Sequence, residues 1–305
     1  MAVFQIGSII RSRREEMGLS QEDLADGICA VPTLSRIENN ERLPTKNHFE
    51  MLMQRLGYSA MSLDFFTDKR DFQIHEIKIR LRYAYISKDY AHARLLLEKF
   101  EKLLKEPTKI DEQFLILYRT LLFLDEYSES EVLKRFEGSL RLTCPKYNVT
   151  HIPHVLSYEE IILLNNIAIS YDKAGNGLQA ITILYTLKEY YEHKIVSTDE
   201  ALRTQPMILY NLSKVLGLQE RYDECIEICN LGIRIARTSG RSVYLGHTFF
   251  NKAWAQLKRN QPGDRENAKM SLKYAWYAFV IMDYQKDADA VCAFYEETFA
   301  ETISA

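Results

Sequence analysis

Residues 18–44 read GLSQEDLADGICAVPTLSRIENNERLP and predict two short helices separated by a tight turn. Ser20 is a good N-cap residue and two acidic residues follow it, so we expect a helix to begin at Gln21. Gly27 marks the early end of that helix. A second helix is expected to open with Pro32 in its first turn, where a missing N–H group loses no intrahelical bond. The stretch therefore predicts a helix-turn-helix.

The apolar residues of both predicted helices are spaced so that they fall on one side. Leu24, Ala25 and Ile28 share a face of the first helix. Leu34 and Ile37 are expected to face them from the second helix. A helix-turn-helix places the start of its second helix in the DNA major groove, where outward side chains reach base edges or phosphates. The side chains expected to point outward there are those of Val31, Pro32, Thr33, Ser35 and Arg36.

Two flanking segments carry a family resemblance. They are Arg-Ser-Arg-Arg-Glu-Glu-Met-Gly-Leu-Ser-Gln at 11–21 and Arg-Ile-Glu-Asn at 36–39. With them, residues 6–56 resemble the Cro/CI (XRE-type) DNA-binding domain. The resemblance implies a structural salt bridge between Arg14 and Glu38. It also implies base or phosphate contacts for Gln21, Val31, Pro32 and Arg36, and a phosphate contact for Asn39. The full set of candidate DNA-binding residues is Gln21, Val31, Pro32, Thr33, Ser35, Arg36, Asn39 and Arg42.

The sequences of the turn and the second helix point to a smaller group of proteins that carry such a domain. The segment Gly-Ile-Cys at 27–29 lies in a short turn and precedes Leu-Ser-Arg-Ile-Glu at 34–38. This combination resembles the peptide-pheromone regulators grouped as Rgg, NprR, PlcR and PrgX. The resemblance implies a homodimer that binds double-stranded DNA, with a short signalling peptide as its ligand.

The first 60 residues are nearly neutral, with seven Lys and Arg against eight Asp and Glu. Many DNA-binding modules are basic, so affinity here has to come from the placement of a few contacts. Two copies on paired half-sites of a palindromic operator would meet that need, because each copy neutralises only a few phosphates. The alternative is a helix-turn-helix that serves protein contact only.

The composition of the whole chain limits its function. A length of 305 residues favours two domains, and 47% hydrophobic with 11% aromatic residues excludes general disorder. The net charge is −3, and neither a long apolar run nor a cleavable signal is present. We therefore expect a cytoplasmic protein without membrane contact.

No catalytic or metal-binding pattern stands out. The five cysteines suit reduced thiols, and the Cys225 and Cys229 pair, one helical turn apart, is interpreted as buried core. His151 and His154 lie in an expected loop and are not interpreted as ligands. A phosphate-binding loop, a catalytic triad order and a nucleophile elbow are all missing from the sequence. We expect no enzyme activity, no cofactor and no metal.

The chain beyond about residue 72 repeats a helical unit. A polar turn followed by a small residue recurs at Ala93, Ala180, Cys225 and Ala268. This pattern is typical of tetratricopeptide repeats, in which a small residue lets paired helices approach closely. The expected pairs span residues 72–104, 110–143, 157–193, 203–238 and 241–282, with a capping helix at 285–301. We predict an all-α chain with a helix-turn-helix domain at 1–66 and a tetratricopeptide-like superhelical solenoid at 72–305. Residues 64–71 are the expected linker, and 143–153 an expected long loop.

A peptide site is predicted on the inner surface of the solenoid. Asparagines recur at matching positions of three pairs, and an amide can donate to and accept from a peptide backbone. Cations on the same surface would attract an acidic side chain or a terminal carboxylate. The candidate residues are Lys78, Arg82, Arg119, Asn166, Asn211, Lys214 and Asn251. The aromatic residues Tyr118, Tyr171, Phe250 and Trp254 are interpreted as core.

These features predict a transcription regulator that responds to a peptide, and the resemblance to the peptide-pheromone regulators implies a role in quorum sensing. Peptide binding would favour one arrangement of the two DNA-binding domains of a dimer on the operator. Two alternatives remain. The solenoid could be a protein-docking scaffold without a small ligand, or the chain could inhibit a signalling protein, as the related Rap proteins do. Arg36 and its outward neighbours favour DNA binding, because an inhibitor would not need them.

Overall fold

The computed structural model describes residues 6–57, 69–153, 155–193 and 199–303. All regular elements of this described part are helices, and the contacts divide the chain into two units, residues 1–170 and 171–305. The predicted all-α fold, a helix-turn-helix followed by helical repeats, is confirmed. The exact domain boundaries at 66 and 72 stay a prediction, because residues 58–68 lie outside the described residues.

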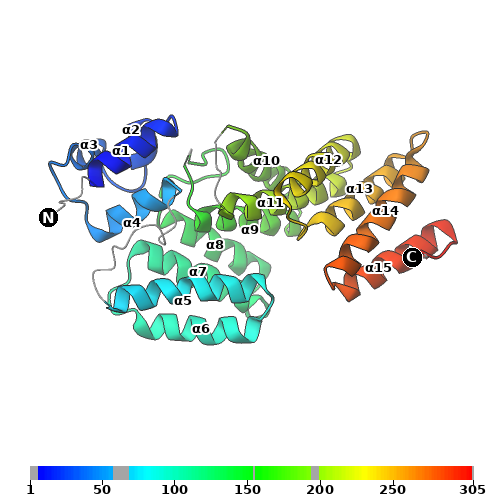
Figure 1. Cartoon of the computed structure of the whole chain (residues 1–305), viewed down its shortest axis with the longest axis horizontal. Coiled ribbons are helices and arrows are strands. Elements are labelled where there is room, and N and C mark those ends of the chain that lie inside the picture. The colour runs from blue at the N-terminus through cyan, green and yellow to red at the C-terminus, as the bar shows by residue number, and fades with distance from the viewer. Residues whose placement is uncertain (1–5, 58–68, 154, 194–198, 304–305) are drawn as a thin grey trace. The chain divides into compact units, whose positions relative to one another are not determined.

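Figure 1 shows the helices in chain order. Those of the first unit are α1 (Ile6–Glu16), α2 (Gln21–Ala25), α3 (Val31–Glu38), α4 (Lys46–Arg55), α5 (Lys69–Ile86), α6 (Tyr90–Leu103), α7 (Lys109–Leu122), α8 (Glu129–Arg141) and most of α9 (Tyr158–Lys173). The second unit contains α10 (Gly177–His193), α11 (Asp199–Leu218), α12 (Tyr222–Ser239), α13 (Leu245–Arg259), α14 (Asp264–Ile281) and α15 (Gln285–Phe299).

The helix-turn-helix forms where the sequence places its caps. The Ser20 hydroxyl accepts the backbone N–H of Asp23, and the Asp23 carboxylate accepts the N–H of Ser20, which completes a capping box at the start of α2. Pro32 lies in the first turn of α3. Thr45 caps α4 by accepting the N–H of His48. The predicted start of α2 at Gln21 is confirmed.

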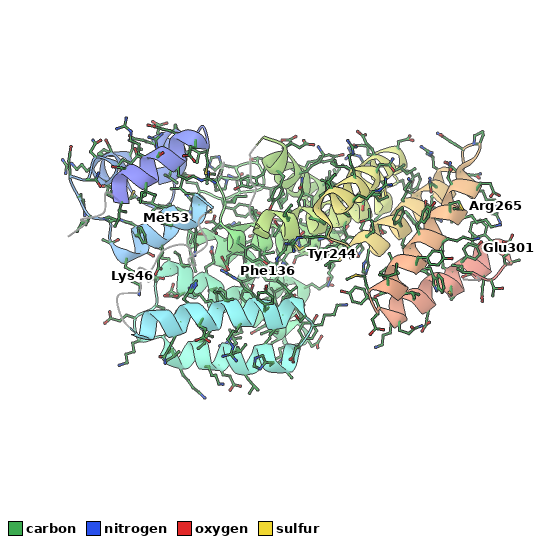
Figure 2. All side chains as sticks on the ribbon, in the orientation of Figure 1. Lys46, Met53, Phe136, Tyr244, Arg265 and Glu301 are labelled. Carbon is green, nitrogen blue, oxygen red and sulfur yellow. The ribbon has the colours of Figure 1, made fainter. Side chains whose placement is uncertain are left out.

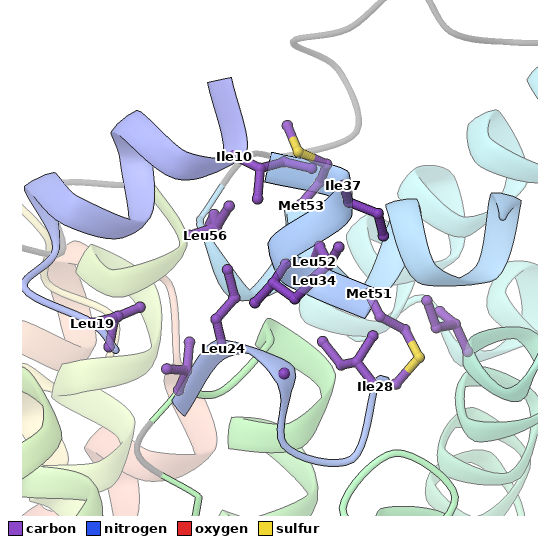
Figure 3. Close-up of a cluster of buried hydrophobic side chains, with 13 residues drawn as sticks. Ile10, Leu19, Leu24, Ile28, Leu34, Ile37, Met51, Leu52, Met53 and Leu56 are labelled. Atoms are coloured by element: carbon purple, nitrogen blue, oxygen red, sulfur yellow. The ribbon is translucent and has the colours of Figure 1, made fainter. Parts of the chain in front are cut away.

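Apolar residues of α1 to α4 form one core. Figure 3 shows Leu24, Leu34 and Leu52 pointing toward one another, and all three side chains are fully buried. Ile10 of α1 and Ile37 of α3 belong to the same cluster. The periodic apolar positions of the sequence are therefore the ones that hold α2 against α3.

Three repeat helices of the first unit also begin at side-chain caps. Thr108 with Asp111 forms a capping box at α7, and Ser128 with Glu131 forms another at α8. Asp89 caps α6. These caps fix where each helix starts, and α5 with α6 and α7 with α8 cover the first two predicted pairs, 72–104 and 110–143.

The small residues of the predicted repeat are buried at helix contacts. Ala93, Ala180 and Ala268 are fully buried, and Cys225 is 1% exposed. The remaining predicted pairs correspond to α9 with α10, α11 with α12 and α13 with α14, and α15 is the expected terminal helix. Helices of 13 to 20 residues explain why this repeat is longer than the ~34 residues of ordinary tetratricopeptide repeats. Figure 2 shows the side chains, with Tyr244 directly before α13.

Connecting segments match the sequence in part. Residues 143–153 carry no helix, as expected, and Asn148 pairs with His151 in an isolated β-bridge. Of the expected linker, 64–68 lie outside the described residues and 69–71 belong to α5. His154 is also outside them, and Cys225 and Cys229 are buried as interpreted.

None of the described helices combines the length and apolarity needed to cross a bilayer.

Candidate DNA and peptide interfaces

The buried ion pair that the resemblance implied is present in the helix-turn-helix. Arg14 Nε lies 2.6 Å from Glu38 Oε1, and Arg14 Nη2 lies 3.0 Å from Glu38 Oε2. The same guanidinium donates to the carbonyl of Leu19, and the Gln21 amide donates to Glu38 over 2.7 Å. The hydrogen bond to Glu38 raises the pKa of Arg14. This network fixes α1 against α3, and it orients Gln21 at the start of α2.

Helix α3 and the segment after it expose half of the predicted DNA-binding residues to solvent. Arg36 is exposed, and no hydrogen bond or ion pair joins its side chain to any residue that the structure describes. Val31 differs, because it is half-buried and packs against the core of the domain. Thr33 and Ser35 are half-buried as well. The other exposed candidates are Pro32, Asn39 and Arg42. Their roles at DNA stay predictions.

A second buried ion pair joins the helix-turn-helix to the repeat helices of the first unit. Arg55 ends α4, Glu160 lies in the first turn of α9, and both side chains are 2% exposed. Arg55 Nη2 lies 3.5 Å from Glu160 Oε1. Arg55 also donates to the backbone carbonyls of Asp26 and Thr143. One arginine therefore ties the end of α4 to the helix-turn-helix turn, to the segment after α8 and to α9.

The Glu160 carboxylate is fully engaged in this cluster. It accepts the Thr143 hydroxyl over 2.7 Å, the Cys144 thiol over 3.2 Å and the Ser157 backbone N–H over 2.7 Å. Burial acts to raise the pKa of Glu160, but Arg55 and these donors outweigh it and the pKa lies below its ordinary value. Burial and the neighbouring Glu160 raise the pKa of the Cys144 thiol, so the thiol stays protonated and donates.

The turn of the helix-turn-helix fits closely against the same segment. Gly27 has a left-handed backbone with φ of 73°, and a Cβ there would lie 2.3 Å from the Thr143 carbonyl oxygen. Only glycine allows that approach. Lys146 adds an exposed ion pair to Asp26 over 2.7 Å. No local sequence motif indicated this docking contact, because its partners lie far apart along the chain.

The predicted peptide-binding cations of the first unit already have anionic partners. Lys78 Nζ lies 2.7 Å from Asp111 Oδ1. Arg82 pairs with Glu159, and Arg119 pairs with Glu101. The Asn166 amide donates to the carbonyl one turn back in its own helix, that of Ile162, over 2.8 Å. Each of these side chains therefore already has a partner within the chain, and its contact with a peptide stays a prediction.

The predicted residues of the second unit gather at a cavity. About 350 Å³ of space lies among α11, α12, α13, α14 and α15, and both Lys214 and Asn251 line it. Asn211 is 8% exposed on α11 and does not line it. Asn251 donates to Ser213 Oγ over 3.0 Å. The structure therefore brings together two of the three candidate residues of this unit.

Aromatic residues form much of the cavity wall. Phe250 and Trp254, interpreted from the sequence as core, line it together with Tyr210 and Phe279. Asp287 was not anticipated, and it lies 3.9 Å from His247 Nε2 on the same wall. The small residue that recurs once per repeat indicates helix packing but not a cavity, so the sequence carried no signal for this wall.

Solved structures with the same fold have low sequence identity to this chain. That of Bacillus thuringiensis PlcR in complex with the peptide PapR7 and DNA has a TM-score of 0.59 at 19% identity, covering 94% of this chain and 98% of that chain. Apo ComR from Streptococcus vestibularis has a TM-score of 0.56 at 18% identity, with 97% and 98% covered. ComR from S. thermophilus in complex with DNA and its signalling peptide ComS has a TM-score of 0.51 at 17% identity, with 96% and 99% covered.

Family models assign both parts of the chain. A comparison with curated protein sequences found no match. A helix-turn-helix model matches residues 10–62, and the model of the RNPP family C-terminal domain matches residues 68–291, which is most of the chain. The predicted kinship with peptide-pheromone regulators is confirmed. The chain belongs to the RNPP family and carries its C-terminal domain behind an N-terminal helix-turn-helix.

Proposed function

We propose that this chain is a transcription regulator that binds double-stranded DNA through α3 and a short signalling peptide through its repeat domain. The observation that carries the proposal is that one chain combines a helix-turn-helix with a helical repeat domain. A helix-turn-helix presents an exposed Arg36, and a helical repeat contains a largely apolar cavity. No step of this function requires a cofactor or a catalytic group. Its place of action is the cytoplasm, where the DNA target lies.

Two features support the DNA-binding half. The Arg14–Glu38 pair and the apolar core hold α3 rigidly, so its outward residues are positioned before DNA arrives. An arginine at this place can donate two hydrogen bonds to a guanine in the major groove. Since the domain is nearly neutral, we propose a homodimer that reads two half-sites and so doubles these few contacts.

The peptide-binding half rests on the cavity in the second unit. Peptide sites are concave and mostly apolar, with a few polar groups that fix orientation. Lys214 and Asn251 supply such groups at the cavity, and Asn211 lies on α11 nearby in sequence. Of the solved structures that share this fold, that of PlcR contains the peptide PapR7 and DNA, and one of ComR contains DNA and its signalling peptide ComS.

Linkage between the two sites would produce the regulation. A peptide that binds one arrangement of the dimer more tightly shifts the population toward that arrangement. The DNA-binding domains then fit or misfit the two half-sites of the operator, and coupling of ~1–3 kcal/mol is typical of such systems.

Selection from a pool of random duplexes by the full chain tests the proposed DNA binding. We expect enrichment of a sequence with two-fold symmetry, whose half-sites lie about one or more helical turns apart. Enrichment should be reduced at higher salt, because phosphate contacts release counterions. A pool that stays random after repeated rounds would overturn DNA reading and favour a docking scaffold instead.

A further inference from the structure

The cavity of the second unit has a composition that selects among peptides. Its volume of about 350 Å³ lies at the small end of the range for ligand sites. Phe250 and Trp254 of α13 and Phe279 of α14 form an aromatic wall, and Val291 of α15 adds an aliphatic one. A space of this size and lining suits one bulky apolar side chain rather than a length of backbone.

Charges of opposite sign line the same cavity. Lys214 comes from α11 and is exposed, and no described residue forms a hydrogen bond or an ion pair with its ammonium group. Asp287 comes from α15, beside His247. The charge of Lys214 also reaches Asp172. Burial raises the pKa of that carboxyl above its ordinary value, and Lys214 offsets part of the rise. The cavity is therefore polar at defined points, and its unpaired cation favours an anionic ligand group.

Asn251 also lines the cavity and offers a hydrogen-bond acceptor. The side-chain nitrogen of Asn251 already donates to Ser213, and its amide oxygen has no hydrogen-bond donor among the residues that the structure describes. A peptide N–H could donate to that oxygen. The apolar wall suits the side chain of one peptide residue. The Lys214 ammonium group and the Asn251 amide oxygen suit a carboxylate and an N–H group next to that side chain.

We propose that this cavity is the anchor pocket of the peptide site and takes one bulky apolar side chain while Lys214 binds an adjacent carboxylate. The inference rests on the proposed peptide binding and names the class of peptide. A free carboxylate beside an apolar side chain has two sources, the C-terminus itself or an acidic neighbour. Both present the same chemistry to Lys214.

Small probes test the pocket without knowledge of the natural peptide. The protein is the full chain with Trp276→Phe, so that Trp254 in the cavity wall is the remaining reporter of the two tryptophans. N-acetyl-L-phenylalanine should change Trp254 fluorescence and bind at least about 10-fold more tightly than N-acetyl-L-alanine, which corresponds to ~1.4 kcal/mol. N-acetyl-L-phenylalaninamide, which lacks the carboxylate, should bind about 3- to 10-fold more weakly, because an exposed lysine is partly screened by solvent.

Two variants locate the binding. Lys214→Met keeps the aliphatic stem and should abolish the preference for the acid over the amide, whereas Lys286→Met removes an exposed charge of α15 outside the cavity and should not. Ala290→Phe should fill the cavity from its exposed rim and block every probe, whereas Ala174→Phe adds the same ring at an exposed position elsewhere. Circular dichroism verifies that each variant keeps its helices.

Two dipeptide probes separate the sources of the carboxylate. N-acetyl-alanyl-phenylalanine carries it at the C-terminus, and N-acetyl-aspartyl-phenylalaninamide carries it on a neighbouring side chain. The dipeptide that binds more tightly identifies the source of the carboxylate that Lys214 binds. Absence of probe binding to the parent, equal binding of acid and amide, or binding unaffected by Lys214→Met and Ala290→Phe overturns the pocket. None of these results affects the DNA selection, so failure of this inference is distinct from failure of the proposed function.

Discussion

Replacing Glu160 with alanine is expected to lower the free energy of unfolding by about 3–5 kcal/mol, because Arg55 is then left buried without its counter-charge. The two side chains are each 2% exposed, so water cannot take over the solvation of the guanidinium. The hydroxyl of Thr143 and the thiol of Cys144 lose their acceptor as well. Urea unfolding followed by circular dichroism measures the loss.

Two controls separate the buried pair from charge removal in general. Glu301→Ala breaks the exposed ion pair with Lys269 and should change stability little. The double variant Arg55→Met with Glu160→Leu removes both charges and should recover part of the stability, because no charge is left buried alone while the hydrogen-bond partners of both residues stay unpaired. If Glu160→Ala unfolded at the same urea concentration as the parent, the docking contact would not hold in solution.

The same contact should depend on pH. The folded-state pKa of Glu160 lies below its ordinary value, so its stabilising contribution is complete above the ordinary carboxyl pKa of 4.5. The contribution is lost as the pH falls below that value and through the folded-state pKa. The parent should therefore lose stability on acidification more steeply than the double variant, in the same unfolding experiment.

Replacing Arg36 with alanine is expected to abolish specific operator binding while leaving the fold intact. A well-placed arginine contact is worth ~1–3 kcal/mol of discrimination, and a dimer makes it twice, so the loss reaches ~2–6 kcal/mol. The side chain is exposed and unpaired within the described part of the chain, so its removal leaves no buried partner behind.

The matched control is Arg11→Ala, which removes one exposed positive charge from α1 without touching α3. Fluorescence anisotropy at fixed salt gives the affinity of each protein for the selected operator and for a scrambled duplex. The Arg36 variant should bind both duplexes alike, and the Arg11 variant should retain its preference. Full preference in the Arg36 variant would place the reading residues elsewhere.

Local chemistry explains why the sequence predicted the helices well. The start of α2 follows from Ser20 and the capping box it forms, and Pro32 lies in the first turn of α3. Such signals lie within a few residues of the element they define. The small residue at Ala268 and its counterparts likewise mark where helices must approach, and all of them are buried.

Contacts between distant segments were not predictable in the same way. Arg55 and Glu160 read as ordinary charged residues, and only the folded first unit buries them together. The pairing of Lys78 with Asp111 shows the same limit, because helical periodicity gave the face of the lysine and not its partner. Asp287 became a cavity residue through the packing of α15, which no local motif specifies.

Peptide dependence of operator binding tests the central claim most directly. Affinity of the full chain for its selected operator is measured by anisotropy, with and without the peptide fraction of culture medium from the source organism. We predict that the fraction changes the affinity at least about 5-fold, the lower end of allosteric coupling, and that protease treatment of the fraction removes the change. An operator affinity that is the same with the intact fraction, the digested fraction and buffer would contradict the account.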